Sequence, residues 1–504
     1  MGIFESLFED TSKTVIGLNH ELKSLYLYNK FRKGNKSIIF VTSNLYEANK
    51  VYKSLYNYTD KVWFFPMDDF ITSEAIASSP ELKMTRLETI NEILKNEKGI
   101  VVTNLMGYLR YLPNIKLFEK HKINLEIYKE YVMKNLIESL YAAGYKRVTT
   151  VNMTGDFAVR GYVLDIFPIN EINPIRVEFW GDTLDKIRYF NIDSQRTIEN
   201  INKIEIYPST EFLNTQNEIS LSQKELVKFG KVYSIYDYLD NPIIFYDEIN
   251  TLENNYKNLL EEMYNYSLGL EIDPNTKYMH DFYDLKIEDS YYFDNFNNSL
   301  NSTESYKNVE IAGFDNSISG INKFLNQKLK DGRTIIICLD SRYKINKLID
   351  EIENPNNIFT NENEIYDNKI NFIVKKVNEG FYLKNYVFLT EKELFAKKDS
   401  GNYQTKFKYG TRIRDLNKLE KGDYVVHSAH GIGRYLGLKT ILKGGISKDY
   451  LTIEYKGGDK LYIPVEKIDL ISKYSSSEGM VPKINKLGSL EWEKNKARAR
   501  KKAE

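Results

Sequence analysis

The sequence is poor in the residues that build disulfide frameworks and metal sites. Among 504 residues there is one cysteine, Cys338, within the apolar stretch TIIICL. A single thiol excludes a disulfide framework and a thiolate metal site, so we interpret Cys338 as a core residue. Of the five histidines, His427 and His430 are three residues apart. No cysteine or paired carboxylate near them completes a ligand set, which favours hydrogen bonding over metal binding.

Long apolar runs and a net charge are absent as well. No apolar run approaches the ~18 residues needed to cross a membrane, and MGIFESLFEDTSK lacks the features of a signal peptide. We therefore expect a cytoplasmic protein without membrane contacts. The 70 basic and 70 acidic residues cancel, although residues 411–504 hold 20 Lys and Arg against 12 Asp and Glu. This basic segment fits a nucleic-acid or acidic protein surface, and equally a solvated helix.

The phosphate-binding string GxxxxGK[ST] is also missing. Such a loop cradles nucleotide phosphates with backbone N–H groups, while its Lys and Ser or Thr reach the terminal phosphate and Mg²⁺. Before SIIFVTS the chain has NHELKSLYLYNKF, a segment without glycine in which Lys23-Ser24 is a two-residue coincidence. We therefore expect no cofactor and no metal in this chain. Since no acid–base or nucleophilic constellation is evident, the sequence predicts a protein that is not an enzyme.

What is present begins with alternating strands and helices. The stretches SIIFVTS, VWFFP (62–66) and GIVVTN (99–104) predict strands, and helices are predicted after the first of them and over about 80–97. This alternation is typical of an α/β layer with a parallel sheet. Residues 121–208 change to short strands with period-two alternation, which predicts a separate α+β domain. Helical periodicity resumes from 209 to about 285 around a strand at 242–247, as if the first domain continued after an insertion.

Two further segments complete the first 400 residues. Residues 286–308 are rich in Asn, Ser and Tyr and are predicted to form a loop or linker. A second, small α/β unit is predicted over about 309–397, with strands VEIAGF (309–314), TIIICLD (334–340) and YVFLT (386–390). Nothing in it indicates chemistry, so its default role is that of a spacer.

Residues 423–464 read as a small β-barrel of the SH3 or Tudor type. Val425 and Val426 begin a strand, Gly431 and Gly433 allow a tight corner, and Gly444-Gly445 marks a further strand boundary. The pair at 457–458 lies at a predicted two-residue hairpin between LTIEY and KLYIP. A module with many strand edges and no catalytic group is most often a docking domain.

Two sequence blocks resemble the bacterial transcription-repair coupling factors. VVHSAHGIGRYLGL, followed by DYLTIEYKGGDKLYIPVEKIDLISKY, is similar to the family's RNA-polymerase-interacting domain, a barrel shared with CarD-like transcription regulators. AGYKRVTTVNMTGDFAVRGYVLDIFP, followed by PIRVEFWGDTLDKIRYFNIDSQRT, is similar to the UvrB-related domain with which the family contacts UvrA. The resemblance runs from about residue 30 to the last residue and is weakest between about 210 and 400.

The resemblance implies an α/β multidomain chain. Its first domain is a degenerate UvrB-like, helicase-like α/β domain in two parts (1–120 and 209–300), interrupted by an inserted UvrA-binding α+β domain (121–208). A small α/β domain (301–398), a linker (399–414), the polymerase-interacting barrel (415–475) and the start of a helix (476–504) follow. In the family this helix leads to a DNA-translocating motor that uses ATP and Mg²⁺. The motor is missing here, so we expect an N-terminal half, from a truncated gene or a fragment, that reaches DNA only indirectly. The UvrB-like part also lacks GxxxxGK[ST] and, in FFPMDDFITSEAIASSPELKMTRLETI, the long aromatic hairpin with which UvrB clamps DNA.

The strand IRVEFW is the candidate UvrA contact. Alternation places its apolar residues on a buried side and Arg176, Glu178 and Trp180 on the outer side. Arg and Trp are enriched at interface hot spots. The resemblance implies UvrA contacts at Arg160, Arg176 and Trp180, the last matching the family in aromatic character only. The alternative is that Trp180 covers a core edge while the arginines form local ion pairs. The following NIDSQRT is interpreted as turn and packing residues.

The strand RYLGLKTIL (434–442) is the candidate polymerase contact. One of its sides is expected to pair with the following hairpin and the other to remain an open edge, which a partner strand can extend. The resemblance implies that the RNA polymerase β subunit pairs here, at Lys439, Thr440, Ile441 and Leu442. The alternative is that these residues only complete the barrel.

Three functions remain open at this point. The favoured one is the partner-docking half of a coupling factor, which binds stalled RNA polymerase and recruits UvrA for nucleotide excision repair. The second is a CarD-like transcription regulator with an N-terminal extension, although such a regulator has no need of a UvrA-binding domain. The third is a nuclease or ATPase of the helicase superfamily, which a DNA-stimulated ATPase assay distinguishes from the others.

Overall fold

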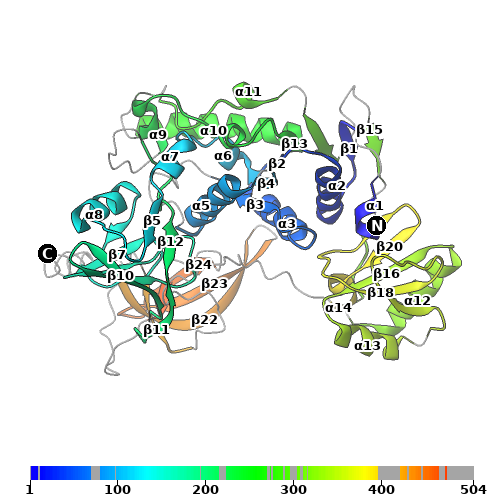
Figure 1. Cartoon of the computed structure of the whole chain (residues 1–504). Coiled ribbons are helices and arrows are strands. Elements are labelled where there is room, and N and C mark those ends of the chain that lie inside the picture. The colour runs from blue at the N-terminus through cyan, green and yellow to red at the C-terminus, as the bar shows by residue number, and fades with distance from the viewer. Residues whose placement is uncertain are drawn as a thin grey trace. The chain divides into compact units, whose positions relative to one another are not determined.

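A computed structural model describes residues 2–8, 12–69, 80–96, 98–192, 194–214, 223–269, 273, 276–287, 290–295, 303–306, 310–314, 316–352, 354–395, 421–427, 431–443, 446–464 and 471–473. The chain divides into two units, and Figure 1 labels their helices and strands. The first comprises residues 1–151 and 155–407, and the second comprises 152–154 and 408–504. Each unit is described by itself.

The first sheet has seven parallel strands in the order β15-β1-β14-β13-β2-β4-β3. β2 and β4 of this sheet are buried along their whole length, as expected for parallel strands with both faces covered. The predicted α/β layer is therefore confirmed. β13 pairs directly with β2, so the chain returns to this sheet after the insertion. The strands are β1 (Thr14–Ile16), β2 (Ile38–Thr42), β3 (Val62–Phe65), β4 (Ile100–Asn104), β13 (Ile243–Asp247), β14 (Tyr291–Asp294) and β15 (Thr303–Ser305).

Two asparagines begin the helices that follow β1 and β2. Asn19 accepts a hydrogen bond from the Leu22 N–H at 2.9 Å, and Asn44 accepts one from the Glu47 N–H at 3.0 Å, which satisfies donors that a helix N-terminus otherwise leaves unpaired. The main helices are α2 (His20–Lys33), α3 (Leu45–Leu55), α5 (Pro80–Lys95) and α10 (Ile249–Gly269). The shorter ones are α1 (Ile3–Ser6), α6 (Leu105–Tyr108), α7 (Lys116–Lys120), α9 (Gln223–Leu226), α11 (Phe282–Leu285), η1 (Val227–Phe229) and η2 (Ile235–Tyr238).

The prediction of a loop over 286–308 was wrong, because β14 and β15 lie in that range and extend the first sheet. The reason is the aromatic run of β14. Phe293 is fully buried and packs edge-on against Tyr26 and Phe40, with ring centroids 5.5 and 5.8 Å apart. Because Asn and Ser surround it, this strand of only four residues was not recognisable in the sequence.

The inserted domain is an α+β layer, as predicted. Its six-stranded sheet has the order β11-β10-β9-β8-β7-β6, and the pair β5 and β12 forms a separate ribbon. Leu136 and Leu140 of α8 (Met133–Ala142) pack on the apolar face of this sheet. The strands are β5 (Ile123–Glu126), β6 (Lys146–Arg147), β7 (Asp156–Arg160), β8 (Val163–Ile166), β9 (Ile175–Trp180), β10 (Thr183–Phe190), β11 (Thr197–Ile201) and β12 (Lys203–Ile206).

The small α/β unit has a five-stranded sheet in the order β17-β18-β16-β20-β19. The strand predicted at VEIAGF was wrong: residues 310–314 form no strand, and Ile311 is buried in the unit's core. The segment is a loop that places Ile311 in the core while its other described residues are exposed or half-buried. The elements are α12 (Ile318–Lys330), β16 (Thr334–Leu339), α13 (Arg342–Glu351), β17 (Asn357–Thr360), β18 (Ile370–Val374), β19 (Phe381–Leu383), β20 (Tyr386–Leu389) and α14 (Glu391–Phe395).

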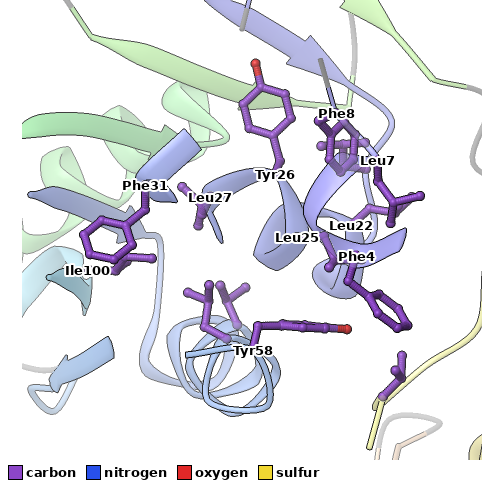
Figure 2. Packing of buried hydrophobic residues seen from close by; sticks show 14 of the residues in the cluster. Phe4, Leu7, Phe8, Leu22, Leu25, Tyr26, Leu27, Phe31, Tyr58 and Ile100 are labelled. Atoms are coloured by element: carbon purple, nitrogen blue, oxygen red, sulfur yellow. The ribbon is translucent and has the colours of Figure 1, made fainter. Parts of the chain in front are cut away.

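One apolar core joins this small unit to the first sheet. Phe4 of α1 packs against Tyr58, with ring centroids 5.7 Å apart, and against Phe388 of β20 at 5.6 Å. Cys338 of β16 is buried in the same core, as predicted. Figure 2 shows the side chains of α1 and α2 converging on this core. The small unit is therefore packed on the α1–α3 layer and is not a free spacer within the described residues.

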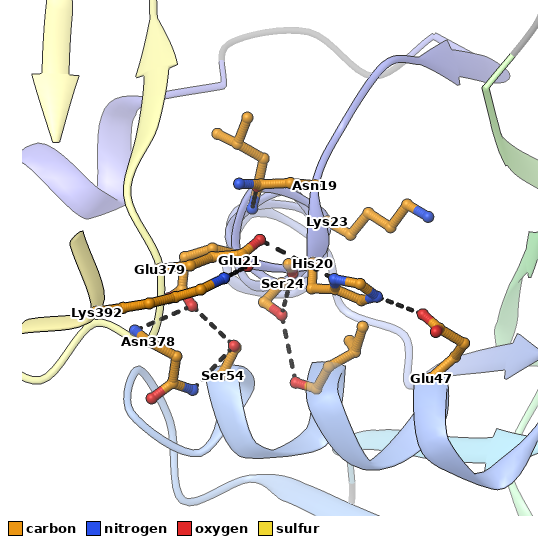
Figure 3. Close-up of polar contacts among 12 residues, drawn as sticks. Asn19, His20, Glu21, Lys23, Ser24, Glu47, Ser54, Asn378, Glu379 and Lys392 are labelled. Carbon is orange, nitrogen blue, oxygen red and sulfur yellow. Dashed lines mark hydrogen bonds and ion pairs between the residues drawn. The ribbon is translucent and has the colours of Figure 1, made fainter. Parts of the chain in front are cut away.

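A polar contact lies beside this core (Figure 3). Glu21 of α2 accepts hydrogen bonds from the hydroxyls of Ser54, at 2.8 Å, and Tyr58, and from the backbone N–H of Asn378 at 3.2 Å. Asn378 belongs to the small unit, so one buried carboxylate connects three segments. Burial raises the pKa of Glu21 to about 7, against the lowering effect of its hydrogen bonds.

The second unit contains a five-stranded antiparallel sheet in the order β24-β23-β22-β21-β25. Leu451, Ile453 and Tyr455 form its buried face, as the alternation predicts. The described pairs form one row of strands, so the closed SH3- or Tudor-like barrel stays a prediction. The strands are β21 (Tyr424–His427), β22 (Gly431–Lys443), β23 (Ile446–Glu454), β24 (Lys460–Pro464) and β25 (Ile471–Lys473).

Two predicted glycine roles in this sheet were wrong. Gly433 lies within β22 instead of at a corner, and a Cβ there would come within 2.5 Å of Ile453 Cγ2, so glycine permits close packing. The turn that contains Gly457 and Gly458 has three residues, 456–458, and not two. Tyr455 and Asp459 pair across it, since the Tyr455 N–H donates to the Asp459 carbonyl at 2.8 Å. Other expectations fall outside the described residues: Gly444-Gly445, His430, the linker 399–414, the helix 476–504 and residues 70–79 of the segment expected to lack the aromatic hairpin.

Candidate functional site

The outer face of the inserted sheet carries the predicted UvrA residues. Along β9 the side chains of Ile175, Val177 and Phe179 are buried, as the sequence alternation predicts. Trp180, at the end of the strand, is 84% exposed. Trp180 therefore does not cover a core edge, which was the alternative interpretation.

Strand pairing gathers charged residues of four strands on this face. Asp165 of β8 lies opposite Arg176 of β9, which in turn lies opposite Arg188 of β10. Paired residues of neighbouring strands project to the same side of a sheet. In the next row Arg160 of β7 lies opposite Val163, which lies opposite Glu178. The face thus brings together Arg160 and Arg176, which are 16 positions apart in the chain.

Both arginines contact one buried carboxylate. Arg176 donates from Nε and Nη2 to the two oxygens of Asp165 at 2.7 and 2.9 Å, and Arg160 donates from Nη2 at 3.0 Å. Hydrogen bonding to Asp165 raises the pKa of Arg176 further. Arg176 also donates to Gln195 Oε1 at 2.9 Å. The local ion pairs of the alternative interpretation therefore exist, beside an exposed Trp180.

Sequence reasoning missed two residues of this face. Asp165, which holds both arginines, was passed over because a single Asp within LDIF resembles any polar residue of a strand. Tyr162 is 69% exposed in the two-residue turn between β7 and β8. Its carbonyl accepts a hydrogen bond from the Phe179 N–H at 3.0 Å, which places it beside the end of β9 that bears Trp180. The aromatic directly after Arg160-Gly161 was a signal for it.

The edge of β22 carries the predicted polymerase residues. β22 pairs with β23 from Arg434 to Lys443, whereas its pairing on the β21 side ends at Arg434, with two further backbone bonds at Tyr435. In the described part of this unit, the stretch from 436 to 443 thus has a strand on one side only. Lys439 is exposed and its ammonium lies 5.3 Å from the centre of the Tyr462 ring. For Thr440, Ile441 and Leu442 the structure describes the backbone alone.

The surroundings of Lys23 bear on nucleotide binding. Gly17 precedes Lys23 by six residues, the spacing of the first Gly and the Lys in GxxxxGK[ST], and this was overlooked in the sequence. Leu22 replaces the second glycine. Only residues 17–19 separate β1 from α2, so Lys23 lies one turn inside the helix. Its ammonium donates to Asp247 Oδ1 at 2.6 Å, and both side chains are more than nine-tenths buried.

The described residues offer neither a candidate metal cluster nor a candidate membrane-spanning helix. They contain no group of three or more His, Cys, Asp and Glu residues arranged to hold a metal ion. None of the helices among them combines the length and the apolar character that crossing a membrane requires.

Comparison with known proteins gives matches to two family models. Residues 123–212 match the UvrB interaction domain, and residues 419–475 match the CarD-like/TRCF RID domain. The first range contains the face with Arg160, Arg176 and Trp180, and the second contains β21–β25.

Individual relatives agree with these matches along almost the whole chain. The transcription-repair-coupling factor of Staphylococcus epidermidis is 27% identical over 571 residues, covering 99% of this chain and 48% of the relative. That of Bacillus subtilis is 28% identical over 563 residues, covering 98% and 47%. That of Staphylococcus aureus strain MRSA252 is 27% identical, covering 99% and 48%. The chain spans about half the length of these relatives. These matches confirm the resemblance found in the sequence. The chain is similar to the transcription-repair-coupling factors, and the matched domains and the coverage are consistent with the N-terminal half of those proteins.

Proposed function

We propose that this chain is the partner-docking part of a transcription-repair coupling factor. It holds RNA polymerase through the second unit and recruits UvrA through the inserted domain. It contacts DNA only indirectly and hydrolyses no nucleotide of its own. The observation that carries the proposal is the outer face of the inserted sheet, where Trp180 and Arg160 are exposed within the region that matches the UvrB interaction domain.

The proposed UvrA surface consists of Arg160, Arg176 and Trp180. Trp, Tyr and Arg are the residue types enriched at interface hot spots. Trp180 supplies apolar area, and the guanidinium of Arg160, the more exposed of the two arginines, supplies directed, charge-assisted hydrogen bonds. Tyr162 adds a second exposed aromatic at the same end of the sheet.

The proposed polymerase surface is the edge of β22 at Lys439, Thr440, Ile441 and Leu442. Its support is the pairing pattern, since this stretch has a partner strand on one side only among the described residues. Backbone N–H and C=O groups on such an edge accept an added strand. We assign that strand to the β subunit of RNA polymerase. Leu438, half exposed on the same strand, supplies apolar area next to it.

We propose that this chain binds neither ATP nor Mg²⁺. The support is Lys23, whose ammonium is already paired with Asp247 inside the protein. A phosphate would have to separate this pair, and the loop before α2 is too short to wrap around it.

The test uses the purified 504-residue chain on a biosensor. We expect saturable binding of UvrA, saturable binding of the isolated β subunit, and binding of both at once. A DNA-stimulated ATPase assay of the same preparation should give no turnover above the buffer blank. Polymerase binding without UvrA binding would favour a CarD-like regulator instead, and ATP turnover that is lost in Lys23→Ala would refute the non-enzymatic assignment.

A further inference from the structure

The two arginines of the proposed UvrA surface are held unequally. Arg176 engages both oxygens of Asp165, and its Nη2 also donates to Gln195 Oε1. Arg160 contacts Asp165 through Nη2 alone. The Arg176 side chain is only 16% exposed, whereas that of Arg160 is 53% exposed. Of the two guanidinium groups, Arg160 is thus the one that a partner reaches.

Arg176 is fixed from a further direction by an aromatic ring. Its guanidinium carbon lies 4.6 Å from the centre of the Phe190 ring, in the range of a cation–π contact. Asp165 itself is 2% exposed. Asp165, Arg176, Gln195 and Phe190 therefore form a rigid support beneath Arg160, which we call the brace.

The charges of the cluster do not cancel. Arg160 and Arg176 carry two positive charges and Asp165 one negative charge, so the group presents one positive charge in excess. A guanidinium fork matches a carboxylate in a two-bond geometry that lysine cannot reproduce. The complementary group on a protein partner is an Asp or Glu side chain.

We propose that the brace positions Arg160 before binding, and that Arg160 forms a two-bond contact with a carboxylate of UvrA. This inference rests on the proposed function. Arg160 ends β7, and its backbone is fixed by the two-residue turn in which Gly161 has a φ of +61°. Its long side chain would otherwise lose rotamer freedom on binding. The hydrogen bond to Asp165 already restricts the Arg160 side chain in the free protein, so less rotamer freedom is lost on binding. Asp165 and Arg176 are therefore positioning residues.

The experiment is a set of double-mutant cycles, read out as the Kd for UvrA. Arg160→Ala should weaken binding about tenfold or more, and Arg160→Lys should weaken it nearly as much, because the charge remains but the fork is lost. Asp165→Asn and Arg176→Lys should each weaken binding in the native background. Neither should weaken it further when Arg160 is already alanine. Lys186→Ala, which removes a positive charge from the same face, is the matched control and should change Kd less than threefold.

The readouts separate positioning from simple support of the fold. The melting temperature is measured for every variant. If Asp165→Asn fails to fold, Gln195→Ala replaces it, because this substitution removes one exposed hydrogen bond of Arg176. Additive effects of Arg176→Lys and Arg160→Ala on Kd would overturn the inference, because they would mean that Arg176 contacts UvrA directly. Full binding by Arg160→Lys would overturn the two-bond contact. If the native chain does not bind UvrA at all, the proposed function itself fails, and this outcome is distinct from the others.

Discussion

Arg86 of α5 and Glu211, which follows the inserted domain, form a two-bond ion pair in the protein interior. Nε donates to Oε1 at 2.6 Å and Nη2 to Oε2 at 2.8 Å, and each side chain is almost fully buried. Arg110 adds a bond to Oε2 at 3.2 Å. The point at which the chain returns from the inserted domain is thus fastened to the helical layer of the first sheet.

Removing the charge of Glu211 should be costly. Glu211→Gln leaves Arg86 and Arg110 buried without their counter-charge, and we expect a loss of about 3–5 kcal/mol in the free energy of unfolding. Urea denaturation followed by tryptophan fluorescence measures it. Glu92→Gln, which removes an exposed pair with Lys95, is the control and should cost less than about 1 kcal/mol.

The same carboxylate has a predictable pH dependence. Burial alone would raise the pKa of Glu211, but Arg110 and Arg86 lower it to about 2. A lowered pKa means that the stabilisation is present above the ordinary value of 4.5 and is lost as the pH falls toward 2. A Glu211→Gln variant whose stability deficit stays constant from pH 7 to about pH 5 and shrinks as the pH falls from 4.5 toward 2 agrees with this; a deficit that vanishes by pH 5 does not.

Glu21 should act in the opposite direction. Its pKa is raised to about 7, so its contribution is greatest below pH 4.5 and is lost as the pH rises through 7. Between pH 5 and pH 8 we expect this group to lower the free energy of unfolding by roughly 2–3 kcal/mol. Glu21→Gln cannot ionise and should therefore show a flatter profile than the native chain, measured by urea titrations at four pH values. Parallel profiles would contradict the assignment.

The buried pair of Lys23 and Asp247 should behave as one unit. Lys23→Met leaves Asp247 buried alone, and we expect a loss of about 3–5 kcal/mol in the free energy of unfolding. Adding Asp247→Asn should recover most of this loss, because no isolated charge then remains. The cycle is measured by thermal and urea denaturation, and a double variant as unstable as the sum of the single ones would show that the pair is not coupled.

Trp180 should matter for binding and not for folding. Trp180→Ala removes an exposed indole, so the melting temperature should stay within about 1–2 °C, while UvrA binding should weaken by ~2 kcal/mol or more. Tyr343→Ala is the matched control, since Tyr343 is 78% exposed on α13, outside the proposed surface. Equal Kd values for native and Trp180→Ala chains would exclude Trp180 from the interface.

A charge on the edge of β22 should abolish polymerase binding. Ile441→Arg places a guanidinium in an apolar strand-to-strand contact, whereas Ile441→Val keeps the strand apolar and should bind like the native chain. Binding to the isolated β subunit is measured on a biosensor, and circular dichroism reports whether the sheet is intact. Undiminished binding by the arginine variant would place the polymerase contact elsewhere.

Short-range patterns in the sequence predicted much of this fold. Continuous apolar runs such as the one in Ile38–Thr42 identified strands buried on both faces, and the alternation of IRVEFW identified the exposed side of β9. β14 and β15 were missed because three or four residues among Asn and Ser carry too weak a pattern. Residues 310–314 were assigned wrongly because a loop that places a single apolar residue such as Ile311 in a core can alternate as a strand does.

The candidate site was predictable in part for the same reason. The outward position of Trp180 follows from strand period alone. The joining of Arg160 and Arg176 by Asp165 depends on the register of three strands, and a sequence does not state its register. The pairing of Lys23 with Asp247 joins positions 224 residues apart, which no local pattern connects.

The burial of Cys338 has a practical consequence for labelling. It is the sole cysteine of the sequence, it lies within β16, and burial raises the pKa of its thiol, so little reactive thiolate forms at neutral pH. Maleimide dyes should therefore leave the native chain unmodified. A cysteine introduced at an exposed position such as Tyr343 would then carry a single fluorophore, without any background substitution.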